Sequence, residues 1–239
     1  MALAYYHGKK TPQDFEKALL LGRESSSKLS KYGQLVMGFL TESGAAGVPQ
    51  DEAKAVEWFQ LAAGQDEPDA LNILGSCYFN GDGVQQDLRK AFELYQRSAS
   101  LNNSEALVNL GRMYQHHLVP VVDSYDMSMK RRHLERALEC FNQAADLDDP
   151  RGCLYAALAY QQGLVDGIPQ LYKSWQLLLK GVALGDAMCM INVAKSYDSG
   201  LVHKMSDGTS SQLVPQNYRY YFAKKNSRTL IMSTLQRGI

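Results

Sequence analysis

The 239-residue sequence has no excess charge of either sign, because 25 basic side chains balance 25 acidic ones. Surfaces that hold nucleic acid usually carry a clear basic excess, so this balance argues against such a function. No window approaches the run of about 18 apolar residues that a membrane-spanning helix needs. The opening residues, MALAYYHGKK, show no basic segment followed by an apolar one, so no signal peptide is visible. These absences predict a soluble protein with no membrane or nucleic-acid partner.

Cysteine is also scarce, and no CxxC motif is present. A zinc site needs clustered thiolates or a Cys/His pair at short spacing, and the sequence provides neither. We expect the four cysteines to be small apolar side chains within helices, and the chain to be in a reducing compartment. These residues are Cys77, Cys140, Cys153 and Cys189.

What the sequence has is a period. The stretch VPQDEAKAVEWFQLAAG begins at Val48, and similar stretches begin at Thr11, Val84, Ile168 and Val214. A small residue recurs in step with them, at spacings of 36, 37, 36, 46 and 37 residues: Ala2, Gly38, Gly75, Gly111, Ala157 and Ala194. A period of this length is typical of solenoids, in which each repeat is one supersecondary unit.

Each repeat is predicted to be two helices. The first has its small residue in mid-helix, where glycine costs about 1 kcal/mol, so a closely packed neighbouring helix is expected there. It ends at a glycine, a common left-handed stop: Gly44, Gly81, Gly163 and Gly200. The second helix begins after an Asp or Asn whose side chain can accept backbone N–H groups: Asp14, Asp51, Asp87 and Asn217.

These helix pairs predict an all-α, right-handed α/α superhelical solenoid, because a pair of this size buries its apolar face only by stacking on its neighbours. We expect a single domain over 1–239. Its units are 1–26, 27–65, 66–101, 102–147, 148–183 and 184–226, followed by a capping helix at 227–239. Ala2 already occupies the mid-helix position, so we expect a preceding segment, with any targeting signal, to be missing.

The best-formed repeat is ALNILGSCYFNGDGVQQDLRKAFELYQRSA, from Ala70 to Ala99. Its spacing of Gly, Tyr, Gly-x-Gly-Val, Asp, Lys-Ala and Tyr resembles the Sel1-like repeat, a relative of the tetratricopeptide repeat. The resemblance covers nearly the whole chain and is weaker in the fourth and sixth units, which carry insertions. It implies a protein-binding adaptor, scaffold or regulator without catalytic residues; such proteins include many bacterial factors that engage host or partner proteins.

One branch of that family is secreted and cross-links the helices of each repeat by disulfides. Cys153 occupies one of the matching places, but Ala144 and Ala145 stand where its partner would be. This departure favours a cytoplasmic, reducing location, or the host cytosol if the chain is a bacterial effector.

In the tetratricopeptide-like geometry, first helices line a concave face. Residues three before, one after and four after the small residue then point inward, and about half of them are expected to pack against the next unit. The predicted partner-binding residues on this face are Leu35, Phe39, Asn72, Phe79, Arg112, Gln115, Leu154, Leu158 and Lys195. Asn109 and Asn192 occupy a carboxylate-binding position of related repeats, but they lie two units apart, which argues against a clamp.

Two insertions, at 115–133 and 201–215, lengthen the loop between the first and second helices and are predicted to project from one edge. The first contains an apolar run with Leu118 and Val121, which we add to the predicted partner-binding residues. Such a run either contacts a partner or folds back over its own repeat.

Little in the sequence suggests catalysis. The first insertion contains side chains that could be considered as metal ligands: His116, His117, Asp123, Asp126 and His133. Their spacings fit no known ligand geometry, and a polar loop is the simpler interpretation. We therefore predict no enzyme, no cofactor and no metal, and a protein partner bound on the concave face and the insertion edge. The alternatives are a self-associating array that stacks at Ala2 and, on weaker grounds, a metal-dependent enzyme.

Overall fold

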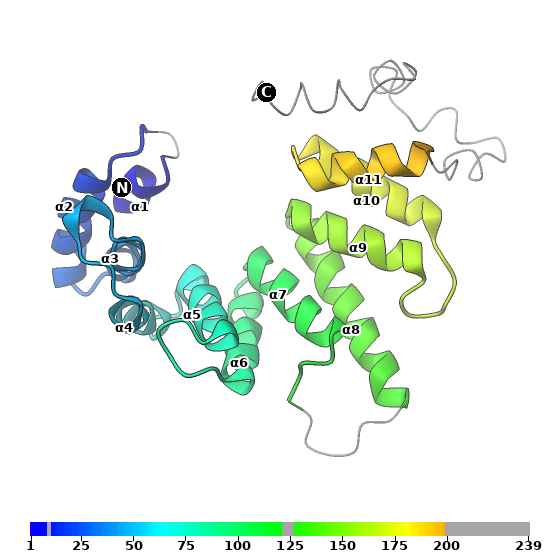
Figure 1. Ribbon diagram of the computed structural model, residues 1–239, viewed down its shortest axis with the longest axis horizontal. Helices are drawn as coiled ribbons and strands as arrows, with labels where there is room; N and C mark the ends of the chain where they lie inside the picture. Colours follow the sequence, from blue (N-terminus) through cyan, green and yellow to red (C-terminus); the bar gives the residue numbers. More distant parts are fainter. Residues whose placement is uncertain (9–10, 121–126, 199–239) are drawn as a thin grey trace. The chain divides into compact units, whose positions relative to one another are not determined.

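The computed structural model describes residues 1–8, 11–120 and 127–198 (Figure 1). Within these residues the chain forms eleven α-helices and one short 3-10 helix, and no strand. The second insertion at 201–215 and the predicted capping helix at 227–239 lie outside the described residues. The helices are α1 (Ala2–His7), α2 (Phe15–Ser27), α3 (Lys31–Ser43), η1 (Ala45–Gly47), α4 (Glu52–Ala63), α5 (Pro68–Asn80), α6 (Leu88–Ser100), α7 (Ser104–Gln115), α8 (Met127–Asp146), α9 (Pro150–Gln162), α10 (Leu171–Ala183) and α11 (Ala187–Asp198).

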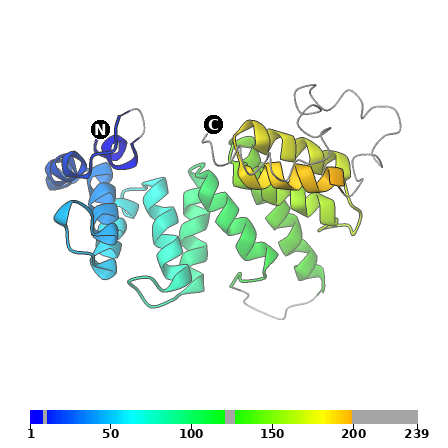
Figure 2. The same cartoon turned by 45° about the horizontal axis from the view of Figure 1, so that its top comes forward.

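The chain divides into two units, Met1–Cys140 and Phe141–Ile239, and the division falls within α8. In the first unit each helix from α1 to α6 packs against the next one along the chain, and α1 also contacts α3 (Figure 2). This sequential stacking of helix pairs is an α/α solenoid, as the period predicts.

The predicted helix starts are confirmed in the first unit. Asp14 and Asp51 each accept a hydrogen bond at 2.9 Å from a backbone N–H three residues later. Asp87 accepts two, both at 3.0 Å, from Arg89 and Lys90. Each carboxylate satisfies donors that the first turn of a helix leaves free, which explains why the stretch recurs. Asn217 lies outside the described residues.

The predicted glycine stops are also present. Gly44 and Gly81 end α3 and α5 with φ of 68° and 91°, a left-handed backbone that glycine adopts without steric cost. Gly163 ends α9 of the second unit in the same way, with φ of 61°. Gly200 is not among the described residues.

The mid-helix glycines are packed against aromatic rings. A Cβ on Gly38 would overlap the ring of Phe59, and one on Gly75 would lie 2.8 Å from Cε1 of Tyr95. Both rings come from the second helix of the same pair and are buried, at 0% and 3% exposure. The expected close approach is therefore found, and an aromatic ring fills the space that the missing methyl group leaves.

In the second unit, α9, α10 and α11 pack in sequence around a core of their own. That core contains Leu154, Ala157, Trp175, Leu178, Val182, Cys189 and Val193. Lys180 connects α10 to the end of α8 and the turn that follows it. Its Nζ donates to the Ala145 carbonyl at 2.6 Å and pairs with Asp148 at 2.9 Å.

All four cysteines are buried in helices and unpaired, as expected of small apolar side chains. The reducing compartment stays a prediction. Among the described helices, none combines the length and the apolar character that crossing a membrane requires.

Candidate functional site

The predicted concave-face residues divide by their position relative to the mid-helix small residue. Those three residues before it, Leu35, Asn72 and Leu154, are buried, at 0%, 4% and 9% exposure. The two leucines belong to the apolar cores, so they lie beneath the surface that a partner would touch. Burial was expected at about half of the predicted positions, and it is found at those three residues before the small residue.

The remaining predicted residues are at least partly exposed. Arg112 and Lys195 are exposed, and the partly buried side chains are Phe39, Phe79, Gln115 and Leu158. Leu118 of the insertion is 36% exposed, whereas Val121 lies outside the described residues. Whether a partner binds any of them stays a prediction.

Three of the predicted residues meet in one pocket of the first unit. Phe79 on α5, Arg112 on α7 and Leu118 in the insertion line a cavity of about 190 Å³, together with Tyr95 of α6 and His116. We call it the basic pocket. Residues predicted for the concave face and for the insertion edge, which were expected as separate surfaces, therefore line the same pocket.

The basic pocket offers a cation and hydroxyl groups. The Arg112 side chain has no ion pair or hydrogen bond to the residues that the structure describes. At the pocket wall the hydroxyls of Ser76 and Tyr95 lie 3.0 Å apart and share a hydrogen bond. Burial raises the pKa of Tyr95 above its ordinary value, although Ser76 and the Arg112 charge act in the opposite direction, so the phenol is neutral at pH 7.

A chain of side-chain hydrogen bonds lies beside this pocket. Asn109 of α7 donates from Nδ2 to Oδ1 of Asn72 on α5 at 3.0 Å, and Asn72 donates to Glu105 at 3.2 Å. The buried Asn72 thus joins the first helices of successive repeats. Asn192 instead donates to the carbonyl of Met188 in its own helix, at 2.8 Å.

The start of the first insertion folds partly onto its own repeat. The rings of His117 and His133 on α8 lie 5.8 Å apart, and Tyr114 also contacts His133. Burial, followed by neighbouring positive charges, lowers the pKa of both histidines. His117 thus packs on α8, while Leu118, the next residue, lines the basic pocket.

The imagined metal cluster gains no support from these histidines. No group of three or more His, Cys, Asp or Glu side chains that could hold a metal ion occurs among the described residues. Asp123 and Asp126 lie outside them.

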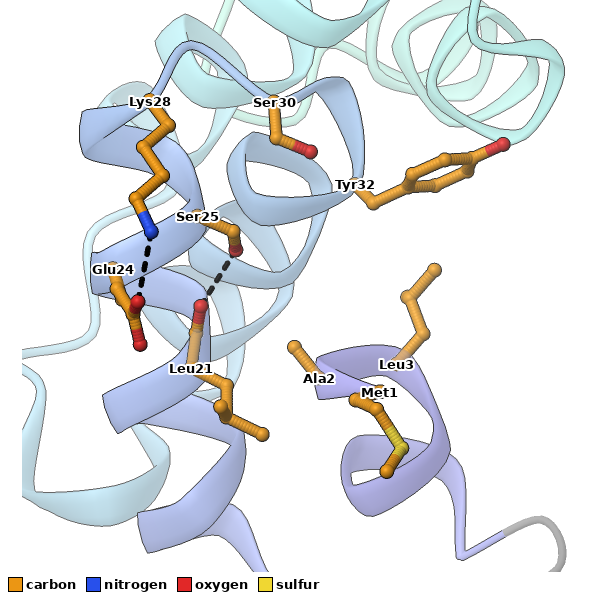
Figure 3. A pocket seen from close by; sticks show the side chains of 9 residues that line it. All are labelled: Met1, Ala2, Leu3, Leu21, Glu24, Ser25, Lys28, Ser30 and Tyr32. Carbon is orange, nitrogen blue, oxygen red and sulfur yellow. Dashed lines mark hydrogen bonds and ion pairs between the residues drawn. The ribbon is translucent and has the colours of Figure 1, made fainter.

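A larger pocket, which the sequence analysis did not anticipate, lies between α1, α2 and the start of α3. Its volume is about 530 Å³ (Figure 3). Leu3 of α1 lies across it from Leu21 of α2 and from Tyr32 of α3, which is 53% exposed. None of the predicted partner-binding residues lines it. Ala2, the predicted stacking end, is itself 8% exposed and belongs to the core.

Helix pairs stacked in sequence, with a ring packed on the mid-helix glycine at Gly38 and Gly75, define the class of protein as an α/α solenoid. The Sel1 repeat model matches six segments: residues 1–27, 31–67, 68–103, 104–121, 131–149 and 150–186. Together they cover more than half of the chain, which therefore belongs to the Sel1 repeat family. The fourth and fifth segments lie on either side of the first insertion, within one helix pair. Sel1 repeat proteins generally mediate protein–protein interactions and are typically scaffolds without catalysis of their own.

Solved structures show the same fold. A Sel1 repeat protein from Oxalobacter formigenes is 24% identical with a TM-score of 0.71, over 88% of this chain and 81% of that one. An immunity protein from Pseudomonas aeruginosa is 19% identical with a TM-score of 0.52, over 79% of this chain and 67% of that one. A search of curated protein sequences finds no match.

Proposed function

We propose that this chain is an adaptor or regulator that binds a partner protein through the basic pocket, where the concave face meets the insertion edge. The observation that carries the proposal is the meeting of Phe79, Arg112 and Leu118 around one cavity. An arginine beside an aromatic ring, with an apolar rim, is the composition found at the energetic centre of protein interfaces. A role as a bacterial effector or regulatory factor is part of this proposal and follows from the family alone.

The unpaired state of Arg112 supports the proposal further. Several helix-surface arginines and lysines of this unit form an ion pair with a carboxylate, as Arg97 does with Asp66 at 2.6 Å. Arg112 has no such partner among the described residues, so binding a carboxylate there would break no existing ion pair. Phe79 is only partly buried and supplies apolar area beside that charge.

The test is affinity purification from the native source, comparing the wild-type chain with the single variants Arg112→Ala and Phe79→Ala. Arg89→Ala is the matched control, because Arg89 is exposed on α6 and does not line the pocket. A partner recovered by the wild type and the control, with affinity reduced roughly 5- to 30-fold in both pocket variants, is the expected result. Equal affinity in all four proteins would remove the basic pocket as the binding site.

Self-association is the alternative, and the pocket beneath Tyr32 favours it. The same helix pairs expose Leu20 and Leu29, at 69% and 74%, so a second chain would find apolar surface there. Light scattering across the micromolar range tests this, with Tyr32→Lys expected to dissociate the assembly. A wild-type protein that is monomeric throughout removes the alternative.

A further inference from the structure

A second pocket of the first unit repeats the basic pocket one helix pair earlier, with the opposite charge. It has a volume of about 240 Å³, and its lining includes Glu42, Glu52, Phe59, Cys77 and Asp82. We call it the acidic pocket. It lies between α3 and α4 of one pair and α5 of the next, as the basic pocket lies between α5, α6 and α7.

Two rim positions and one aromatic ring correspond between the two pockets. Glu42 and Phe79 each follow their mid-helix glycine by four residues, whereas Asp82 and Leu118 follow the next one by seven. The ring that packs on the glycine also lines each pocket, Phe59 in one and Tyr95 in the other. Two successive junctions of the first unit thus each contain a pocket beside the ring that packs on the mid-helix glycine, and the charges at the rims of the two pockets differ.

The acidic pocket lacks a counter-charge. None of its three carboxylates forms an ion pair with a described residue, and Asp82 accepts only the amide hydrogen bond from Asn80. The side chain of Cys77 lines the pocket at 5% exposure. Burial, and then the nearby charges of Asp82 and Glu52, raise the pKa of Glu42, so a positive charge bound among these carboxylates would relieve their mutual repulsion. The acidic pocket therefore favours a cationic group.

The two pockets adjoin. Asn80 lines the basic pocket and donates from Nδ2 to Oδ2 of Asp82, which lines the acidic pocket, at 2.9 Å. Packed helices stand about 8–10 Å apart, so pockets at successive junctions are separated by a distance on the order of 10 Å. An extended chain covers that distance in about three residues.

We propose that the two pockets together bind one extended segment of the partner protein, with a Lys or Arg in the acidic pocket and an Asp or Glu about three residues away in the basic pocket. This inference rests on the proposed function and adds the chemistry of the partner to it. The proposed charge pattern is based on the charged side chains at the two rims. Glu42, Glu52 and Asp82 form no ion pair with a described residue at one junction, and Arg112 forms none at the next. Opposite charges at adjoining sites also fix the orientation of the segment, because the reversed placement sets like charges together.

The experiment selects peptides from a displayed random library on the purified full chain. Wild-type protein is expected to enrich sequences with a basic and an acidic residue about three positions apart. Arg112→Glu makes both junctions acidic, so it is expected to enrich sequences with two basic residues and to bind the wild-type peptides on the order of tenfold more weakly. Arg89→Glu changes the net charge equally outside the pockets and is expected to select as the wild type does.

The outcomes separate the two proposals. If the enriched peptides lack a basic and an acidic residue about three positions apart, but bind Phe79→Ala more weakly than the wild type, the proposed charge pattern is wrong and the proposed function stands. Enrichment of free carboxyl termini or phosphorylated residues at the basic pocket, without a basic residue nearby, also overturns it. Enrichment of no peptide over a blank surface would overturn both proposals. Circular dichroism melting of each variant checks that the fold is intact, and Glu42→Lys, at an exposed position, provides a second charge reversal.

Discussion

Replacing Gly38 by Ala tests whether the mid-helix glycine exists to admit an aromatic ring. The added methyl group would overlap the ring of Phe59, whose Cδ1 and Cζ would lie 2.6 and 3.0 Å from it. Ordinary carbon–carbon contacts begin near 3.5 Å, so the ring must move by roughly 1 Å. Phe59 is fully buried, and the acidic pocket that it lines is the space toward which its ring could move.

Two opposing effects set the size of the change. Alanine stabilises a helix by about 1 kcal/mol relative to glycine, whereas overpacking a filled core costs about 1–3 kcal/mol. Because the contact is very short and the ring is buried, we expect overpacking to dominate. The free energy of unfolding should fall by about 1–2 kcal/mol. Gly75→Ala should cost less, because the Tyr95 ring atoms lie at 2.8 and 2.9 Å.

Urea unfolding followed by circular dichroism measures the change, and the transition midpoint is the safest quantity for a repeat array. Gly64→Ala is the control: its φ of −61° suits alanine, and its nearest contacts are backbone oxygens at 3.3 and 3.5 Å. Its stability should change by less than about 0.5 kcal/mol. In a Phe59→Leu background, Gly38→Ala should become neutral or stabilising. An equal cost in both backgrounds, or no cost in the wild type, would refute the packing explanation.

Three further predictions concern other contacts. Asp87→Ala removes the acceptor of two N–H groups of α6, so the urea midpoint should report a loss of about 1 kcal/mol; an unchanged midpoint contradicts the capping role. Although Glu42 is exposed as a residue, partial burial of its carboxyl group in the acidic pocket and then the charges of Asp82 and Glu52 raise its pKa above 4.5, so its contribution to stability is present below that pH and lost as the pH rises through the raised value. Glu42→Gln should therefore flatten the fall in stability from mildly acidic to neutral pH, and an unaltered pH profile argues against the shift. Burial raises the pKa of Cys77 to about 11 and of Cys140 to about 12, from 9.0, which lowers their thiolate fractions roughly 100-fold and 1,000-fold. A thiol reagent should label them slowly in the folded protein and quickly in urea; equal rates would show that the sites open.

The elements that the sequence predicts well are those whose cause is local. Asp51 caps a helix through N–H groups only three residues away, and Gly44 ends one through its own φ, so a short stretch contains all the information. The period of the repeats then predicts that the helix pairs stack on one another. The aromatic partner of Gly38 is also recognisable, because Phe59 belongs to the apolar stripe of the next helix.

The composition of the pockets could not be predicted in this way. The basic pocket joins Phe79, Tyr95, Arg112 and Leu118 from three helices and an insertion, and the angle between helices decides which of them meet. The same angle places Leu35 in the core, although the concave-face rule assigns it to the surface. A helical period gives the direction of each side chain on its own helix, but not what stands opposite it.

A comparison of the two pockets separates the positions that make the fold from those that remain free to carry function. The glycine and the ring recur at both junctions, as Gly38 with Phe59 and Gly75 with Tyr95, because either change would disturb the packing of a helix pair. The rim positions are under no such constraint, since a charged or an apolar side chain there leaves the helix pairs unchanged. The rim can therefore change between junctions while the fold is kept, as in the change from Glu42 and Asp82 at the acidic pocket to Phe79 and Leu118 at the corresponding positions of the basic pocket.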